Sequence, residues 1–147
     1  MFKHILIPTD GSPASAKAIK AGIALAKQVR ARVTGYHGVG AVPYGAYGEP
    51  MLLDGRSFAQ MERAFLAGGE AYVAQIGKAA RAAGVPFQPV VARTGATYQG
   101  ILEAARSYKC DLIFMASHGR RGFKRILLGS VTQQVLAHSR ISVVVYR

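Results

Sequence analysis

The chain has 147 residues, which is the length of one domain that buries a large apolar core and needs no disulfide bonds or structural metal ions for stability. Half of the residues are hydrophobic, which excludes a disordered chain, yet no apolar run approaches the ~18 residues of a membrane span. Nineteen Lys and Arg against seven Asp and Glu give a formal net charge of +12. A field of this sign concentrates anions, so nucleotides, nucleic acid and acidic membrane surfaces are the partners that the charge allows.

Several classes of protein are not expected from the remaining composition. The single cysteine, Cys110, cannot form an internal disulfide, and no segment resembles a metal site. The first residues form a strand-like run without the long apolar core of a signal peptide, so we expect a cytoplasmic protein without a membrane partner. The basic residues are spread along the chain without interleaved aromatics, so specific nucleic-acid binding is not expected either.

Strand-like and helix-like segments alternate from the start of the chain. Residues 2–8 form the first predicted strand, and Ser12 followed by Pro13 is typical of a helix N-terminus. In the helix that follows, apolar residues recur at steps of three and four, which predicts one buried face: Ala16, Ile19, Ile23, Ala26 and Val29. Residues 32–37 form the second predicted strand.

A long helix is predicted next. Residues 57–60, Ser-Phe-Ala-Gln, have the form of a capping box that would open it, and Gly84 would close it. Its inward residues are predicted to be Met61, Phe65, Tyr72, Ile76 and Ala80. The third predicted strand, 85–91, contains two prolines that cannot donate ladder hydrogen bonds, so it is expected at a sheet edge.

The second half of the chain continues the alternation. A helix is predicted within 94–109, a strand at 112–116, a helix from the capping box at 130–133, and a last strand at 141–146. The first, fourth and last strands are apolar throughout, which is typical of a parallel sheet covered by helices on both faces. We therefore predict one α/β domain over residues 1–147, a doubly wound three-layer sandwich with its ligand at the carboxyl ends of the strands.

The segment 115–132 carries the strongest indication of function. It has glycines at 119, 122 and 129, cations at 120, 121, 124 and 125, and Ser130 where a helix begins. Small residues let the backbone close around an anion, and a helix N-terminus offers N–H groups without partners. The pattern predicts a phosphate site. The alternative is a loop whose glycines serve only its turns, with the cations as a solvated rim.

Two further segments lie at predicted carboxyl ends of strands. Asp10 follows the first strand, where its carboxylate could accept hydrogen bonds from a ribose or a base, or could simply stabilise the turn. The glycine-rich residues 38–56 contain two tyrosines and are either a lid over a ligand or a loop without that role. No pair of carboxylates and no Ser/His/Asp set falls on neighbouring loops, so we assign no catalytic residue and expect slow hydrolysis at most.

Residues 2–12 and the segment 116–132 together resemble the universal stress protein family, and the resemblance extends over essentially the whole chain. It implies a Rossmann-like fold of the adenine-nucleotide-hydrolase type, with a five-stranded parallel sheet of order 3-2-1-4-5. One branch of the family binds ATP through a Gly-x-x-Gly-x9-Gly-Ser/Thr motif. Here the motif reads Ala116-x-x-Gly119-x9-Gly129-Ser130, with the spacing intact and alanine at the first glycine.

The resemblance also implies a site, a ligand and an assembly. The end of the first strand would face the adenosine and the glycine motif the phosphates, which gives these binding residues: Pro8, Thr9, Asp10, Gly38, Met115, Ala116, His118, Gly119, Arg120, Gly129, Ser130, Val131 and Thr132. We expect ATP ahead of ADP or AMP, with Mg²⁺ held through the phosphates, and a homodimer paired through strand 141–146. The alternative is a nucleotide-free stress protein that acts through protein contacts.

Overall fold

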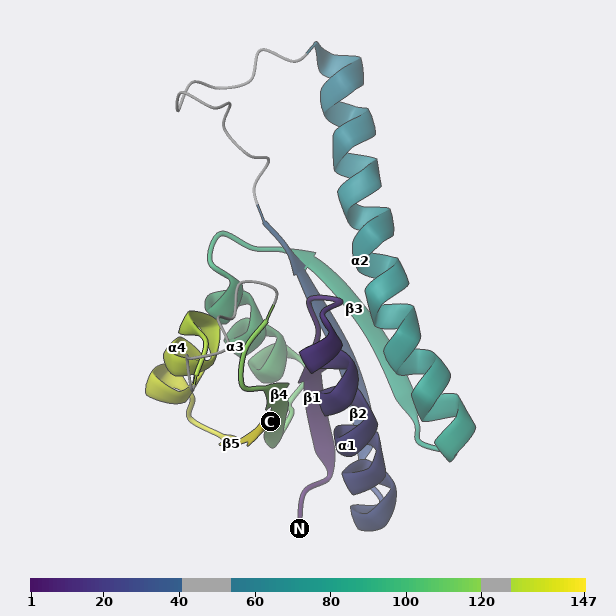
Figure 1. Ribbon diagram of the computed structural model, residues 1–147, viewed down its shortest axis with the longest axis vertical. Helices are drawn as coiled ribbons and strands as arrows, with labels where there is room; N and C mark the ends of the chain where they lie inside the picture. The colour runs from purple at the N-terminus through teal and green to yellow at the C-terminus, as the bar shows by residue number, and fades with distance from the viewer. Residues whose placement is uncertain (41–53, 120–127) are drawn as a thin grey trace.

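The computed structural model describes residues 1–40, 54–119 and 128–147. Within these ranges five strands and four helices alternate: β1 (His4–Pro8), α1 (Pro13–Val29), β2 (Arg32–Val39), α2 (Gly55–Ala83), β3 (Phe87–Arg93), α3 (Thr97–Ser107), β4 (Leu112–Ala116), α4 (Ser130–His138) and β5 (Ser142–Tyr146). The strands are parallel, in the order β3-β2-β1-β4-β5. Helices α1 and α2 lie on one side of the sheet and α3 and α4 on the other (Figure 1). The predicted fold and strand order are confirmed.

The core follows from the alternation of side chains along the central strands. Every residue of β1 and β4 is buried. Ile5 and Ile7 pack with α1 and α2, whereas Leu6 packs with α3 and α4, as the two-residue period of a strand requires. No helix of the described residues combines the length and the hydropathy needed to cross a bilayer.

The two edge strands are those that the sequence indicates. Strand β3, which contains Pro89, lies at one edge, and β5 lies at the other. The valines of β5 are only half-buried, although their apolar run predicted burial on both faces. The difference arises because an edge strand has a neighbour on one side only, and Tyr146 is 39% exposed.

Two helices have a different N-cap residue from the one predicted. Asp54 caps α2, with its Oδ1 accepting the N–H of Ser57 at 3.0 Å, so the capping box at 57–60 is wrong. A carboxylate three residues before Ser57 makes the capping bond itself and adds a turn to the helix. Gly129 is the N-cap of α4 without a side-chain cap bond. Ser130 is already helical, so the predicted capping box of α4 is wrong as well.

Helix α2 is longer than the strands that it covers, and its N-terminal half extends past their carboxyl ends (Figure 1). Ile76 and Ala80 are buried as predicted, but Phe65 is 42% exposed and Met61 is only half-buried. These two predictions fail because no strand among the described residues lies beneath that part of the helix. On α1, Ala16 is exposed, again contrary to prediction.

Candidate functional site

The turn after β1 holds Asp10 in a fixed orientation. Its Oδ1 accepts the backbone N–H of Ser12 at 2.9 Å and the hydroxyl of Ser15 at 2.7 Å. Ser12 caps α1 in turn, since its Oγ accepts the N–H of Ser15 at 3.1 Å. One carboxylate oxygen therefore stabilises the turn, as the structural interpretation of Asp10 predicted. The same bonds orient the other oxygen.

That second oxygen, Oδ2, points at the loop after β4. A Cβ built on Gly119 would lie 2.2 Å from it, so only a glycine fits at this point in the present arrangement. Strands β1 and β4 are neighbours at the centre of the sheet. The strand order reverses there, which is where ligands bind in doubly wound proteins.

The N-terminus of α4 is fastened to the end of β4. The N–H of Gly129 donates to the carbonyl of Ser117 at 2.7 Å, and the hydroxyl of Thr132 donates to the carbonyl of Ala116 at 3.1 Å. A Cβ on Gly129 would lie 3.2 Å from the Cα of His118, so the two backbone segments are in close contact. The first N–H groups of α4 have no partner inside the helix and carry its positive dipole end. This end lies beside the loop that Asp10 touches.

Thr132, one of the predicted binding residues, has a buried side chain. It is 2% exposed, and its hydroxyl is engaged with the carbonyl of Ala116. Its side chain therefore holds α4 against β4, and only its backbone N–H belongs to the exposed helix end. Ser130 is exposed and Val131 is half-buried.

The backbone conformation at the end of β4 is compatible with alanine at position 116. Among non-glycine residues that the structure describes, only Arg30 and Lys109 have a positive φ, so Ala116 keeps a backbone conformation open to any L-residue. It and Met115 are buried, and each can offer only backbone to a ligand. His118, two residues further along the chain, is exposed, and its Nδ1 lies 3.0 Å from the hydroxyl of Ser117.

The remaining predicted residues lie on β1 and β2. Pro8 ends β1, and the N–H of Thr9 continues the sheet by donating to the carbonyl of Tyr36 at 2.9 Å. Gly38 lies on β2, where a Cβ would be 3.0 Å from the hydroxyl of Tyr36. Burial raises the pKa of that phenol, which keeps it protonated. Arg120, the cations at 121, 124 and 125, and residues 41–53 lie outside the described residues.

Sequence reasoning did not identify the serines that hold this site together. Ser15 fixes Asp10, and Ser117 supplies the carbonyl that closes the loop onto Gly129. Ser15 follows the N-cap Ser12 by three residues, at the helix position where a capping box has Glu or Gln, and this position could have indicated the first of them. The role of Ser117 depends on a contact between segments distant in sequence, so no local pattern reveals it.

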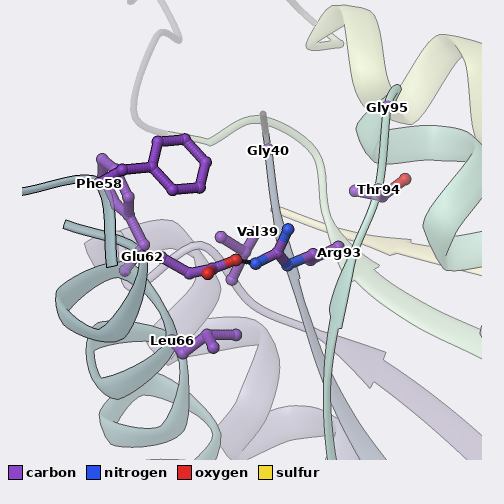
Figure 2. A pocket seen from close by; sticks show the side chains of 9 residues that line it. Val39, Gly40, Phe58, Glu62, Leu66, Arg93, Thr94 and Gly95 are labelled. Carbon is purple, nitrogen blue, oxygen red and sulfur yellow. Dashed lines mark ion pairs between the residues drawn. The ribbon is translucent and has the colours of Figure 1, made fainter. Parts of the chain in front are cut away.

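A separate hollow of about 440 Å³ lies between the N-terminal half of α2 and the ends of β2 and β3. Figure 2 shows Glu62 and Arg93 pointing toward each other across it, and the two form an ion pair. Phe58 and Leu66 of α2 line one wall. None of the predicted site residues that the structure describes lines this hollow.

Other groups that could carry chemistry lie at the amino end of the sheet. Asp111 accepts the N–H groups of Lys3 and His4, at 2.8 and 3.0 Å. Cys110 is buried, and burial raises the pKa of its thiol to about 11, so it is a poor nucleophile. The described residues contain no group of three or more His, Cys, Asp or Glu that could hold a metal ion.

The fold and the geometry of this edge define a class: a doubly wound α/β sandwich with an oriented carboxylate and a helix N-terminus at its topological switch point. The sequence model of the Universal stress protein family matches residues 1–147. A universal stress protein of Methanocaldococcus jannaschii is 33% identical over 147 residues, which cover 100% of this chain and 83% of that protein. The chain belongs to the universal stress protein family.

Solved structures agree with this assignment. The protein MJ0577 of Methanocaldococcus jannaschii superposes with a TM-score of 0.76 at 26% identity, covering 99% of this chain and 95% of the other. A universal stress protein in complex with cAMP gives a TM-score of 0.64 at 22% identity, covering 99% and 97%. One from Archaeoglobus fulgidus in complex with dAMP gives 0.60 at 13% identity, covering 100% and 98%. At these two lower identities the likeness shows the fold.

Proposed function

We propose that this protein binds an adenine nucleotide, ATP in preference to ADP or AMP, and serves as a sensing or regulatory stress protein. The observation that carries the proposal is the contact between the Asp10 carboxylate and Gly119 beside the N-terminus of α4. It puts a hydrogen-bond acceptor for a ribose or base next to donors for phosphate. The complexes of family members with cAMP and with dAMP support the same ligand class.

Each part of the site has a distinct role in the proposal. Asp10 accepts hydrogen bonds from the nucleoside, and the backbone N–H groups of 130–132 donate to the phosphates. Gly119 and Gly129 keep the backbone open to the ligand, and His118 is an exposed donor beside them. The backbone at Pro8, Thr9, Met115 and Ala116 lines the nucleoside, and Gly38 lies on its base side. The cations at 120–125 favour a triphosphate, with Mg²⁺ bound through its oxygens.

The proposal includes no catalytic residue, and any hydrolysis of ATP is slow. It also includes a cytoplasmic location and a homodimer paired through the edge strand β5, with each nucleotide site formed within one subunit. The alternative is a nucleotide-free stress protein that acts through protein contacts alone.

The test begins with freshly purified protein. We expect mass analysis of the ligand released on denaturation to find an adenine nucleotide, or calorimetry to detect ATP binding to the emptied protein. Asp10→Ala removes acceptors worth ~1.5–3 kcal/mol per charge-assisted hydrogen bond, so the affinity for ATP should fall by roughly tenfold to a hundredfold. No released nucleotide, with no calorimetric signal for ATP or ADP at millimolar concentration, would favour the nucleotide-free alternative.

A further inference from the structure

Helix α2 packs against the turn that carries Asp10. The ring of Tyr72 lies so close to Gly11 that a Cβ there would be 2.3 Å from its Cε1. Gly11 also has a φ of +75°, which L side chains rarely adopt. The sharp turn next to Asp10 is therefore shaped both by its own glycine and by an aromatic ring from the middle of α2.

A histidine on β2 binds the main chain at Thr9, the residue before Asp10. The Nδ1 of His37 lies 2.8 Å from the carbonyl oxygen of Thr9. A carbonyl can only accept, so Nδ1 carries the proton and donates it to this bond. The His37 ring in turn meets Tyr72 edge to face, with centroids 5.2 Å apart and planes at 70°.

The close approach of α2 that makes this possible depends on a glycine of the helix. A Cβ on Gly69 would lie 2.8 Å from the Cδ2 of His37. Gly69 is buried, and it lies one turn before Tyr72 on the same helix. The absence of a side chain at Gly69 therefore lets α2 approach the rings of His37 and Tyr72, and α2 runs unbroken from Gly55 to Ala83.

We propose that Tyr72 and His37 are positioning residues for Asp10, an inference that rests on the proposed nucleotide site. The carboxylate is fixed through Oδ1 by Ser12 and Ser15, and the main chain on its two sides is fixed by His37 and Tyr72. Together these contacts aim Oδ2 at Gly119. A loop held in its binding geometry before the ligand arrives loses less conformational entropy on binding, which raises affinity.

The first test compares two variants of Tyr72 by calorimetry with ATP. Tyr72→Ala removes the ring that supports Gly11, and we expect the affinity to fall about tenfold. Tyr72→Phe keeps the ring and should retain most of the wild-type affinity for ATP. Phe65→Ala, on the same helix but 42% exposed, is the matched control and should bind ATP like the wild type. Equal losses in Tyr72→Phe and Tyr72→Ala would overturn the role of the ring.

A double-mutant cycle asks whether Tyr72 acts through Asp10. Asp10→Asn removes the negative charge but keeps a polar side chain of the same size, and it should weaken ATP binding. In this background, Tyr72→Ala should have little further effect on the affinity for ATP. A full additional tenfold loss would mean that Tyr72 affects binding by another route, which would overturn the inference.

A readout without nucleotide separates this inference from the proposed function. In the ligand-free protein, Tyr72→Ala should accelerate amide hydrogen exchange in the segment 10–12, while Phe65→Ala should not. If the wild type binds no adenine nucleotide but this exchange accelerates, the proposed function fails and the support of the loop by Tyr72 stands. If the wild type binds ATP and Tyr72→Ala changes neither affinity nor exchange, the positioning role is wrong.

Discussion

The Oδ2 atom of Asp10 and the backbone of Gly119 are in contact, so that a methyl group on Gly119 would lie 2.2 Å from the carboxylate oxygen. The two residues come from loops in opposite halves of the chain and meet because β1 and β4 are adjacent strands. This relationship gives a physical reason for a glycine at position 119 of the motif: any side chain there displaces the carboxylate.

Gly119→Ala should weaken ATP binding about tenfold, because Asp10 must rotate away from the added methyl group and loses its aligned acceptor. Calorimetric titration measures the effect. Gly68→Ala is the matched control: a Cβ there meets nothing within 4 Å, so ATP binding should be unchanged and α2 should gain up to ~1 kcal/mol of stability. An unchanged affinity in Gly119→Ala would mean that the ligand does not use this loop.

Gly129→Val should reduce ATP binding below detection while the protein still folds. The branched side chain would press on the backbone of His118, since even a Cβ would be 3.2 Å from its Cα, and it would obstruct the first N–H groups of α4. Calorimetry gives the affinity, and circular dichroism checks that the fold is retained. Wild-type affinity in a folded Gly129→Val protein would place the phosphates elsewhere.

The distributed positive charge predicts weak binding to nucleic acid that depends on phosphate contacts alone. Fluorescence anisotropy with two duplexes of unrelated sequence should give equal affinities, which fall steeply between about 50 and about 200 mM salt. Tight binding that persists at the higher salt concentration, or a preference for one sequence, would contradict this expectation.

The homodimer prediction concerns β5, whose outer edge has no strand beside it among the described residues. Tyr146 at its end and Leu136 on the neighbouring α4 are 39% and 42% exposed, an apolar surface that a second subunit would cover. Light scattering at micromolar concentration should find a dimer for the wild type. Val145→Pro removes an N–H from the outer edge of β5, because the carbonyl of Tyr146 accepts the N–H of Ser117 on the β4 side and successive residues of a strand face opposite neighbours. This variant should give monomers or insoluble chains, whereas Val145→Ala keeps the N–H and should remain dimeric. A monomeric wild type, or a dimeric Val145→Pro, would contradict this interface.

A pH dependence of stability follows from His4. It is 4% exposed, and its Nε2 lies 2.7 Å from the hydroxyl of Thr34. Burial, together with the charge of Arg32, lowers the pKa of His4 below 6.5, although Asp111 acts in the opposite direction. Below pH 6.5 the unfolded chain therefore binds a proton that the folded chain resists. This contribution to stability is complete above pH 6.5 and is lost as the pH falls toward the lowered pKa.

Urea unfolding at neutral and mildly acidic pH measures this effect as a change in the free energy of unfolding. His4→Gln should show a weaker loss of stability on acidification than the wild type. His118→Gln, which changes an exposed histidine, should keep the wild-type dependence. The same loss of stability in His4→Gln and in the wild type would exclude His4 as its source.

The sequence by itself determined the elements and their arrangement. The apolar runs at 5–7 and 112–115 are confirmed as central buried strands, and the strand with Pro89 is confirmed as an edge, because patterning and backbone chemistry are local properties. The glycine spacing and the resemblance of both ends of the chain indicated the family.

Only the tertiary structure decided how the parts of the candidate site touch. The choice of Asp54 as N-cap of α2 and of Gly129 as N-cap of α4 depended on which backbone conformation the fold permits. The exposure of Phe65 depended on how far α2 extends beyond its strands. The contact of Asp10 with Gly119, and the support of its loop by Tyr72, join segments far apart in sequence. Such contacts arise from packing in three dimensions, which no local pattern encodes.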